Sequence, residues 1–293
     1  MPLFGIHPRA VHRTTPPTKS IRKSCGNLLL LVPALGYLCI FFFFPIAFLL
    51  FQSALAPGNY LRVLQEPVYL EVMYRTAKMS LAVTIVCLAL GYPFAYFLTT
   101  ASQRVVNLAI GVVMMPFWTS ILVRSYAWLV LLQREGIINK ALLELRLIAR
   151  PLKLVYNLNG VICGISYIML PYMILVLYAS MRNVDLQLLV VARSLGATRL
   201  RAFYKIFVPL TAKGIMEGCS LVFILSFGYF ITPALLGGRE QTTFSMLIDI
   251  QMNQLLDWRF GATLSAVLLL VIMLLVFGVR RIVRLERSVQ WLQ

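Results

Sequence analysis

Aromatic side chains within apolar segments are the residues of this chain best suited to bind a ligand. Aromatic faces attract a desolvated cation such as an ammonium group, and prolines beside several of these aromatics free backbone carbonyls that also suit a cation. The alternative is that they only pack between helices or mark the membrane interface. The candidates for a ligand path are Trp118, Tyr92, Tyr96, Tyr172, Phe227 and Tyr229.

Charged side chains near these aromatics are few. Glu217 is the only acid within an apolar segment, and acids in a membrane are functional candidates by default. Lys213 lies four residues earlier on the same helical face and offers a simple ion pair instead. Arg124 is expected to extend its charged end to the membrane surface. Asp249 and Asp257 fall in a polar loop, where they can meet another protein, a passing cation or only solvent.

No arrangement of residues for covalent chemistry or nucleotide hydrolysis is present in the sequence. The phosphate-binding glycine-lysine motif is absent, so no ATP site is expected on this chain. His7 and His12 lie in the N-terminal tail, and the five cysteines lack metal-ligand spacing. We therefore expect no catalytic residue, no metal site and no bound cofactor.

The composition is that of an integral membrane protein. Apolar residues make up 60% of the 293 residues, and only 13% are charged, about half the share in soluble chains. The net charge of +17 does not indicate nucleic-acid binding, because the basic residues lie at the ends of apolar segments, as membrane topology requires.

Apolar runs predict six transmembrane helices in an all-α fold. The first run, residues 28–51, is too long for the 7 to 15 apolar residues or so of a signal peptide. A full span between Arg124 and Arg134 is too short, so an interfacial or re-entrant helix is expected over residues 124–132. An outer loop with a short surface helix is expected over residues 52–72. The predicted spans are residues 28–51, 76–99, 107–121, 160–181, 211–236 and 261–279.

The distribution of charge predicts the orientation. One set of loops and ends carries 16 of the 27 Lys and Arg residues against three acids, whereas the other set carries 11 against seven. The basic side is expected to be cytoplasmic, with both termini on it. The predicted division is a cytoplasmic tail over residues 1–27, a transmembrane domain over residues 28–285 with a loop at 182–209, and a cytoplasmic end at 286–293.

The loop between the fourth and fifth spans is a charged, helical segment between two apolar segments. Leu186 and Leu189 recur at helical spacing, Gly196 interrupts, Thr198 is placed to cap a second short helix, and Pro209 is expected to break that helix before the fifth span. A basic loop resting on anionic lipid would explain the arginines. It would not explain the apolar run LQLLVVA, which predicts a docking surface.

This loop resembles the coupling loop of binding-protein-dependent ABC-importer permeases. The family pattern is Glu-Ala-Ala, three residues, Gly, nine residues, Ile-x-Leu-Pro; here Val190-Val191-Ala192 and Gly196 precede Ile206-Phe207-Val208-Pro209. Valines replace the family's Glu and first Ala, and Val208 replaces its Leu. The resemblance implies contact with an ATPase subunit through Val190, Val191, Ala192, Arg193, Ser194, Leu195, Gly196, Ala197 and Arg199.

Other stretches resemble the first permease of the spermidine/putrescine branch. They are NYLRVL from Asn59, LGYPFAYFL from Leu90, MPFWTSILVRSYAW from Met115, REGIIN from Arg134, YIMLPYMILVLYASM from Tyr167 and FITPALLGG from Phe230. The resemblance implies a bacterial inner-membrane importer of polyamines made of two unlike permeases, two ATPase subunits that carry ATP and Mg, and a periplasmic binding protein.

Other functions stay open at this point. Related permeases carry ferric iron, thiamine or phosphonate, and a cavity for an anion would need more buried cationic residues than Arg124. A secondary transporter would need internal repeats and several buried ionisable groups, and neither occurs in the sequence. A membrane anchor without transport would leave the charged loop unexplained.

Overall fold

The structure is a computed structural model that describes residues 22–290 of the chain. By internal contacts the chain divides into two units, residues 1–48 and residues 49–293. The predicted tail at residues 1–27 and the predicted end at 286–293 lie partly outside the described residues, and within the described part residues 22–27 and 286–290 are helical.

Helices form almost all of the described chain, and no strand occurs between residues 22 and 290. Together with the family comparison below, this confirms the predicted all-α fold. The α-helices are α1 Arg22–Ala54, α2 Gly58–Gln65, α3 Pro67–Thr100, α4 Gln103–Met114, α5 Ile121–Leu132, α6 Ile137–Glu144, α7 Leu158–Met181, α8 Gln187–Ser194, α9 Arg199–Ala202, α10 Val208–Phe227, α11 Ile231–Leu236, α12 Phe244–Asp249 and α13 Trp258–Gln290. Short 3-10 turns are η1 Met115–Trp118 and η3 Arg239–Gln241, and π-helical turns are η2 Phe203–Phe207 and η4 Ile250–Gln254.

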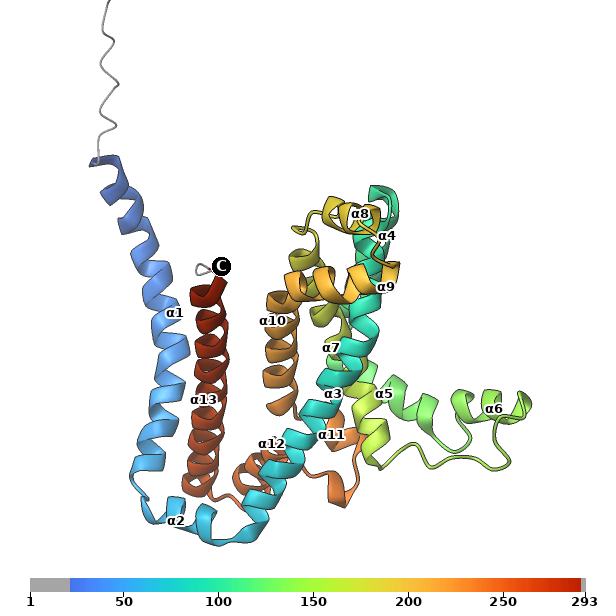
Figure 1. Cartoon of the computed structure of the whole chain (residues 1–293). Coiled ribbons are helices and arrows are strands. Elements are labelled where there is room, and N and C mark those ends of the chain that lie inside the picture. Colours follow the sequence, from blue (N-terminus) through green and yellow to red (C-terminus); the bar gives the residue numbers. More distant parts are fainter. Residues whose placement is uncertain (1–21, 291–293) are drawn as a thin grey trace, which may run out of the picture. The chain divides into compact units, whose positions relative to one another are not determined.

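Five helices within the described residues are long and apolar enough to cross a membrane, and a bent helix pair brings the number to six if it is counted as one span. The five are Leu35–Ala54, Pro67–Thr100, Leu158–Met181, Arg199–Phe227 and Trp258–Gly278. In the second unit, α8 and α9 lie at the same end as the start of α4, and α2 and α12 lie at the other end (Figure 1).

The core of the second unit is built from α3, α7 and α10. Met173 of α7 is fully buried and lies between two glycines: a Cβ at Gly91 of α3 would come within 3.0 Å of its Cγ, and one at Gly218 of α10 within 2.9 Å of its Sδ. Small residues let membrane helices approach closely. These two glycines therefore set the spacing of the three helices around one methionine.

The third span is broken, which corrects the prediction of a continuous helix to residue 121. The segments Gln103–Trp118 and Ile121–Glu144 meet at 98°. Pro116 has no N–H to donate, while the N–H and the hydroxyl of Thr119 both donate to the Pro116 carbonyl. This local pairing ends the helix, and the helix expected over residues 124–132 is the second half of the bent pair.

The fifth span is shorter than predicted at one end and longer at the other. It ends at Phe227 instead of Leu236, because Gly228 ends the helix and α11 begins anew at Ile231. Pro209 does not break the chain's helical path: η2 leads straight into α10, in which proline occupies the first turn. Proline has no N–H, and the π-helical turn η2 directly before it shows where the continuous helix departs from regular α-helical pairing.

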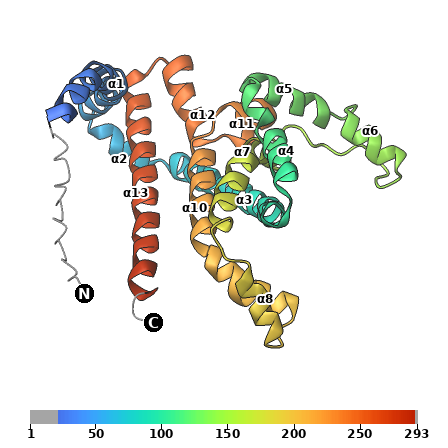
Figure 2. The same ribbon diagram turned by 90° about the horizontal axis from the view of Figure 1, so that it is seen from above.

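The second and sixth spans extend beyond the predicted limits. Helix α3 starts at Pro67, so only α2 and short connections remain of the expected outer loop at residues 52–72; α2 is the expected surface helix. The polar turn expected at residues 102–107 shrinks to Ala101 and Ser102 before α4. Helix α6 projects from the rest of the second unit (Figures 1 and 2).

Candidate functional site

The loop between α7 and α10 folds into two short helices with defined ends. The Asp185 carboxylate accepts a hydrogen bond from the Gln187 N–H at 2.9 Å at the start of α8. At its end, the Gly196 N–H donates to the Arg193 carbonyl and the Ala197 N–H to the Ala192 carbonyl, both at 3.0 Å. This bond pattern is the Schellman motif, which requires a left-handed residue, and Gly196 supplies it with φ of 89°.

The second helix is capped as predicted. The Thr198 hydroxyl accepts a hydrogen bond from the Arg201 N–H at 3.3 Å, and α9 continues into η2. A Schellman end followed within two residues by a side-chain cap fixes the angle between α8 and α9 through local bonds alone. The family's Gly is thus retained here because the backbone needs it.

Apolar side chains of this loop lie on two sides. Leu186 and Leu189 pack against the core, and Ala202 is buried. On the other side Val190, Val191 and Leu195 are exposed at 60%, 56% and 84%, while Ala192 and Ala197 are half-buried. We call the exposed set, together with Leu200, the docking face. Leu200, 70% exposed, was not among the predicted docking residues; its place in the first turn of the capped helix was the available signal.

The basic side chains Arg193 and Arg199 are exposed next to this face, as is Ser194. The Ser194 hydroxyl donates back to the Val190 carbonyl at 3.2 Å and is therefore occupied locally. What the loop offers to another molecule is a small apolar surface with a basic rim, and bare apolar patches of this kind typically mark interaction sites.

Two predicted path residues lie against the end of the loop. Tyr92 and Tyr96 of α3 contact the aromatic side chains of η2: the ring centroids of Tyr92 and Phe203 are 6.0 Å apart, and those of Tyr96 and Phe207 are 5.0 Å apart. Both tyrosines face the end of the bundle that carries α8. The sequence could not show this, because a tyrosine in a long apolar helix carries no sign of its neighbour.

Of the other predicted path residues, Trp118 lies at the bend of the third span and Tyr172 beside it. Trp118 stands at the bend and is 90% exposed. Tyr172 of α7 packs edge-on against Phe117, with 4.9 Å between ring centroids, and the Tyr229 hydroxyl is buried without a hydrogen-bond partner among residues 22–290. Phe227 is buried and stacks on Phe223.

The bend also contains buried polar groups that sequence reasoning missed. The hydroxyls of Ser125 and Thr232 are 3.1 Å apart and join α5 to α11. Arg124 was expected to reach the membrane surface, but its Nε is buried and finds no hydrogen-bond partner among residues 22–290. Thr232 and Ser125 gave no periodic signal, since small polar residues fit either face of a helix.

The remaining acids make local contacts. The Glu217 carboxylate lies 3.8 Å from the Lys213 ammonium, as the ion-pair alternative proposed, and both side chains are about half exposed. The Asp257 carboxylate accepts from the Phe260 N–H at 3.0 Å and so caps the start of α13. Asp249 accepts from the Asn253 amide at 2.7 Å.

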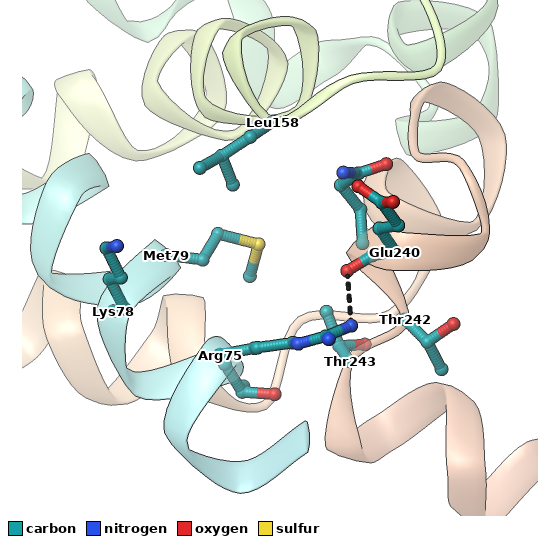
Figure 3. Close-up of a pocket in the computed structure, with 9 residues that line it drawn as sticks. Arg75, Lys78, Met79, Leu158, Glu240, Thr242 and Thr243 are labelled. Carbon is teal, nitrogen blue, oxygen red and sulfur yellow. Dashed lines mark hydrogen bonds between the residues drawn. The ribbon is translucent and has the colours of Figure 1, made fainter. Parts of the chain in front are cut away.

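A cavity of about 270 Å³ lies at the opposite end of α3 from the docking face. Figure 3 shows the Arg75 guanidinium directed at the Glu240 carbonyl, a hydrogen bond of 3.1 Å, with Met79 and Leu158 forming an apolar wall. Arg75 also pairs with Glu71 one helical turn earlier. The cavity therefore lies between α3, the start of α7 and the segment after α11.

These features define a class of protein: a multi-pass membrane subunit whose helices pack around α3, α7 and α10, and whose inter-helical loop presents a preformed docking face. Residues 23–286 match the family of binding-protein-dependent transport system inner membrane components. The chain belongs to this family and is a permease subunit of an importer, multi-pass in the inner membrane.

Relatives and solved structures agree with this assignment. The spermidine/putrescine transport system permease protein PotB of Escherichia coli (strain K12) is 37% identical over 262 residues, which cover 85% of this chain and 95% of the relative. PotB of Haemophilus influenzae is 35% identical over 212 residues, covering 72% and 74%. In structure, the bacterial alginate ABC transporter in complex with its periplasmic protein matches with a TM-score of 0.71 at 15% identity, covering 90% of this chain and 96% of that one.

Proposed function

We propose that this permease forms half of the translocation path for polyamines such as putrescine and spermidine. The observation that carries the proposal is the identity to the PotB proteins over nearly their whole length. Two of the stretches quoted above for this resemblance lie on core helices: the stretch from Leu90 is in α3, and that from Tyr167 is in α7.

The importer would contain a second, homologous permease, two ATPase subunits and a periplasmic substrate-binding protein. ATP and Mg would be bound by the ATPase subunits. Both termini and the docking face would lie in the cytoplasm, in keeping with the excess of Lys and Arg on that side. The ATPase would contact Val190, Val191, Leu195 and Leu200, whose exposure in the isolated chain leaves an apolar surface to be covered.

The polyamine path would pass the bend of the third span. Trp118 projects there without covering side chains, and an indole face is the strongest aromatic partner of an ammonium group. Tyr172 lies on the adjacent core helix. The Tyr229 hydroxyl is buried, whereas Trp118 is exposed, so Trp118 and Tyr172 are the stronger path candidates.

Deletion of this gene in its own host tests the proposal. Uptake of labelled putrescine and spermidine should fall by at least about tenfold and return when the intact gene is supplied on a plasmid, whereas a gene encoding Leu195→Glu should not restore it. Unchanged uptake of both polyamines by the deletion strain, in the absence of another polyamine importer, would refute the substrate. ATP-independent uptake by the purified chain alone would refute the assignment as an ATP-driven subunit.

A further inference from the structure

The turn that follows the docking face is held by α3 and α10 together. The hydroxyl oxygens of Tyr92 in α3 and Thr211 in α10 are 2.9 Å apart. The Tyr96 ring lies edge-on to two of the aromatic rings of η2, with centroids 5.1 Å from Phe203 and 5.0 Å from Phe207. The turn thus contacts α3 through its rings, and the hydroxyl pair ties α3 to α10 directly after the turn.

The direction of the hydroxyl pair follows from the partners of Thr211. Its Oγ1 lies 3.1 Å from the carbonyls of Phe207 and Val208, and a threonine hydroxyl has a single proton to donate. With that proton on the backbone, Tyr92 is the donor to Thr211. The bond therefore links α3 to the backbone at the junction of η2 and α10, next to Pro209, which has no N–H of its own.

The aromatic rings leave the turn little room to move alone. Phe207 is fully buried, and Phe203 stacks on it at 17° with 5.7 Å between centroids. Close-packed side chains switch between discrete arrangements and do not deform continuously. A shift of α8 and α9 carried into η2 must either move the two tyrosines or break their contacts. π-helical turns such as η2 are also frequent at functional sites.

We propose that Tyr92 and Tyr96 are positioning residues that transmit movement of the docking face to α3, with the Tyr92–Thr211 hydrogen bond as the link that keeps α3 and α10 moving together. This inference rests on the proposed function of the docking face as the ATPase contact. It assigns to these two tyrosines a role in coupling in place of the ligand path that their sequence context predicts.

The test uses the complete transporter, purified through a tag on this chain and reconstituted in proteoliposomes. Tyr92→Phe keeps the ring and removes only the hydroxyl; Thr211→Val removes its acceptor. Each should retain the ATPase subunit in full amount but lower substrate transported per ATP hydrolysed by about fivefold, the effect of losing one hydrogen bond. The double variant should be no worse than either single one, because both remove the same bond.

Four further variants separate coupling from general packing. Thr211→Ser keeps the hydroxyl and should preserve the wild-type ratio. Tyr96→Phe should also be silent, since its ring makes the contacts and its hydroxyl bonds to none of the described residues; Tyr96→Leu should lower the ratio. Tyr74→Phe, on the exposed outer part of α3, should be silent as well.

The proposal would be overturned if both Tyr92→Phe and Thr211→Val transported as much substrate per ATP hydrolysed as the wild type. Loss of the ATPase subunit from either variant would also overturn it, because the bond would then support assembly and not transmission. Failure of the proposed docking face is a separate outcome: the ATPase would stay bound to Leu195→Glu. If the polyamine assignment is wrong, the wild-type transporter will not transport putrescine. Coupling is then measured as the stimulation of ATP hydrolysis by the ligand-loaded binding protein.

Discussion

The N–H of Ala197 donates to the Ala192 carbonyl across Gly196, at 3.0 Å. This bond closes the end of α8 and turns the chain toward α9, and it exists only because Gly196 adopts φ of 89°. No heavy atom lies within 4 Å of where a Cβ would be. The glycine is therefore required for its backbone conformation and not for space.

Gly196→Ala should weaken the docking face without disturbing the core. An alanine forced to this φ costs about 1 kcal/mol or more, so the turn between α8 and α9 should loosen and the ATPase should copurify in reduced amount. Gly196→Asn should be milder, because asparagine tolerates left-handed backbone. Gly111→Ala is the control, since it sits in a helix and also in open space. Equal ATPase recovery from all three variants would contradict the backbone role.

Charge placed on the docking face should release the ATPase. Leu195→Glu puts a carboxylate on a side chain that is 84% exposed in the isolated chain, and burying an unpaired charge in an interface costs several kcal/mol. We expect copurified ATPase to fall at least about tenfold. Leu145→Glu, 68% exposed in the segment after α6, should leave recovery unchanged. If Leu195→Glu retains the ATPase and Leu145→Glu loses it, the face has been assigned to the wrong side.

The sequence predicts the long helices well but predicts poorly where a helix is interrupted. Apolar length places α7 and the apolar part of α13, Trp258–Gly278, to within a few residues, because a bilayer demands about 20 apolar residues whatever the neighbours are. The spacing from Gly196 to Pro209 predicts the docking loop for an equally local reason. The bend at Pro116 depends on which carbonyl accepts the hydrogen bonds of Thr119. The helix end at Gly228 depends on where α11 packs. Proline and glycine occur inside membrane helices too, so their presence alone did not predict the breaks.

The contacts of Tyr92 and Tyr96 show the same limit for the site. Their residue type fits both a cation path and an aromatic cluster. The contacts with Phe203 and Phe207 place the two tyrosines in an aromatic cluster. These phenylalanines lie more than 100 residues later in the chain, so no local sequence pattern predicts the contacts.

Enlarging Gly218 should destabilise the packing of α7 on α10. A Cβ there would come within 2.9 Å of Met173 Sδ, so Gly218→Val must displace a fully buried side chain, and overpacking of this kind costs about 1–3 kcal/mol. We expect a lower thermal unfolding midpoint in detergent. Met173→Ala removes the clash, and the double variant should be less destabilised than the sum of the single ones. Simple additivity would mean that these two residues do not share the contact.

Asp257 should stabilise α13 as its cap. Its carboxylate accepts from the Phe260 N–H at 3.0 Å, and loss of such a cap costs about 1 kcal/mol. Asp257→Ala should therefore lower the unfolding midpoint, while Asp257→Asn, which caps equally well, should not. Polyamine uptake by Asp257→Asn should match that of the wild type. A large loss of uptake in a stable Asp257→Asn protein would instead favour contact of this carboxylate with a cation or with the binding protein.

Replacement of Trp118 tests the ligand path. Its side chain is 90% exposed at the bend of the third span, so Trp118→Ala removes no buried packing and should leave assembly and ATPase binding intact. If an amine passes over the indole, removal of a partly desolvated cation–π contact of about 1–2 kcal/mol should slow ATP-dependent uptake of putrescine by roughly five- to thirtyfold. Trp118→Phe keeps an aromatic face and should retain part of the rate.

Met115→Ala, three residues earlier and 69% exposed, is the matched control for losing apolar surface at the same bend. Equal uptake by Trp118→Ala and Met115→Ala would remove Trp118 from the path, whereas slow uptake by Trp118→Ala alone, with normal amounts of bound ATPase, is the result that an aromatic path requires.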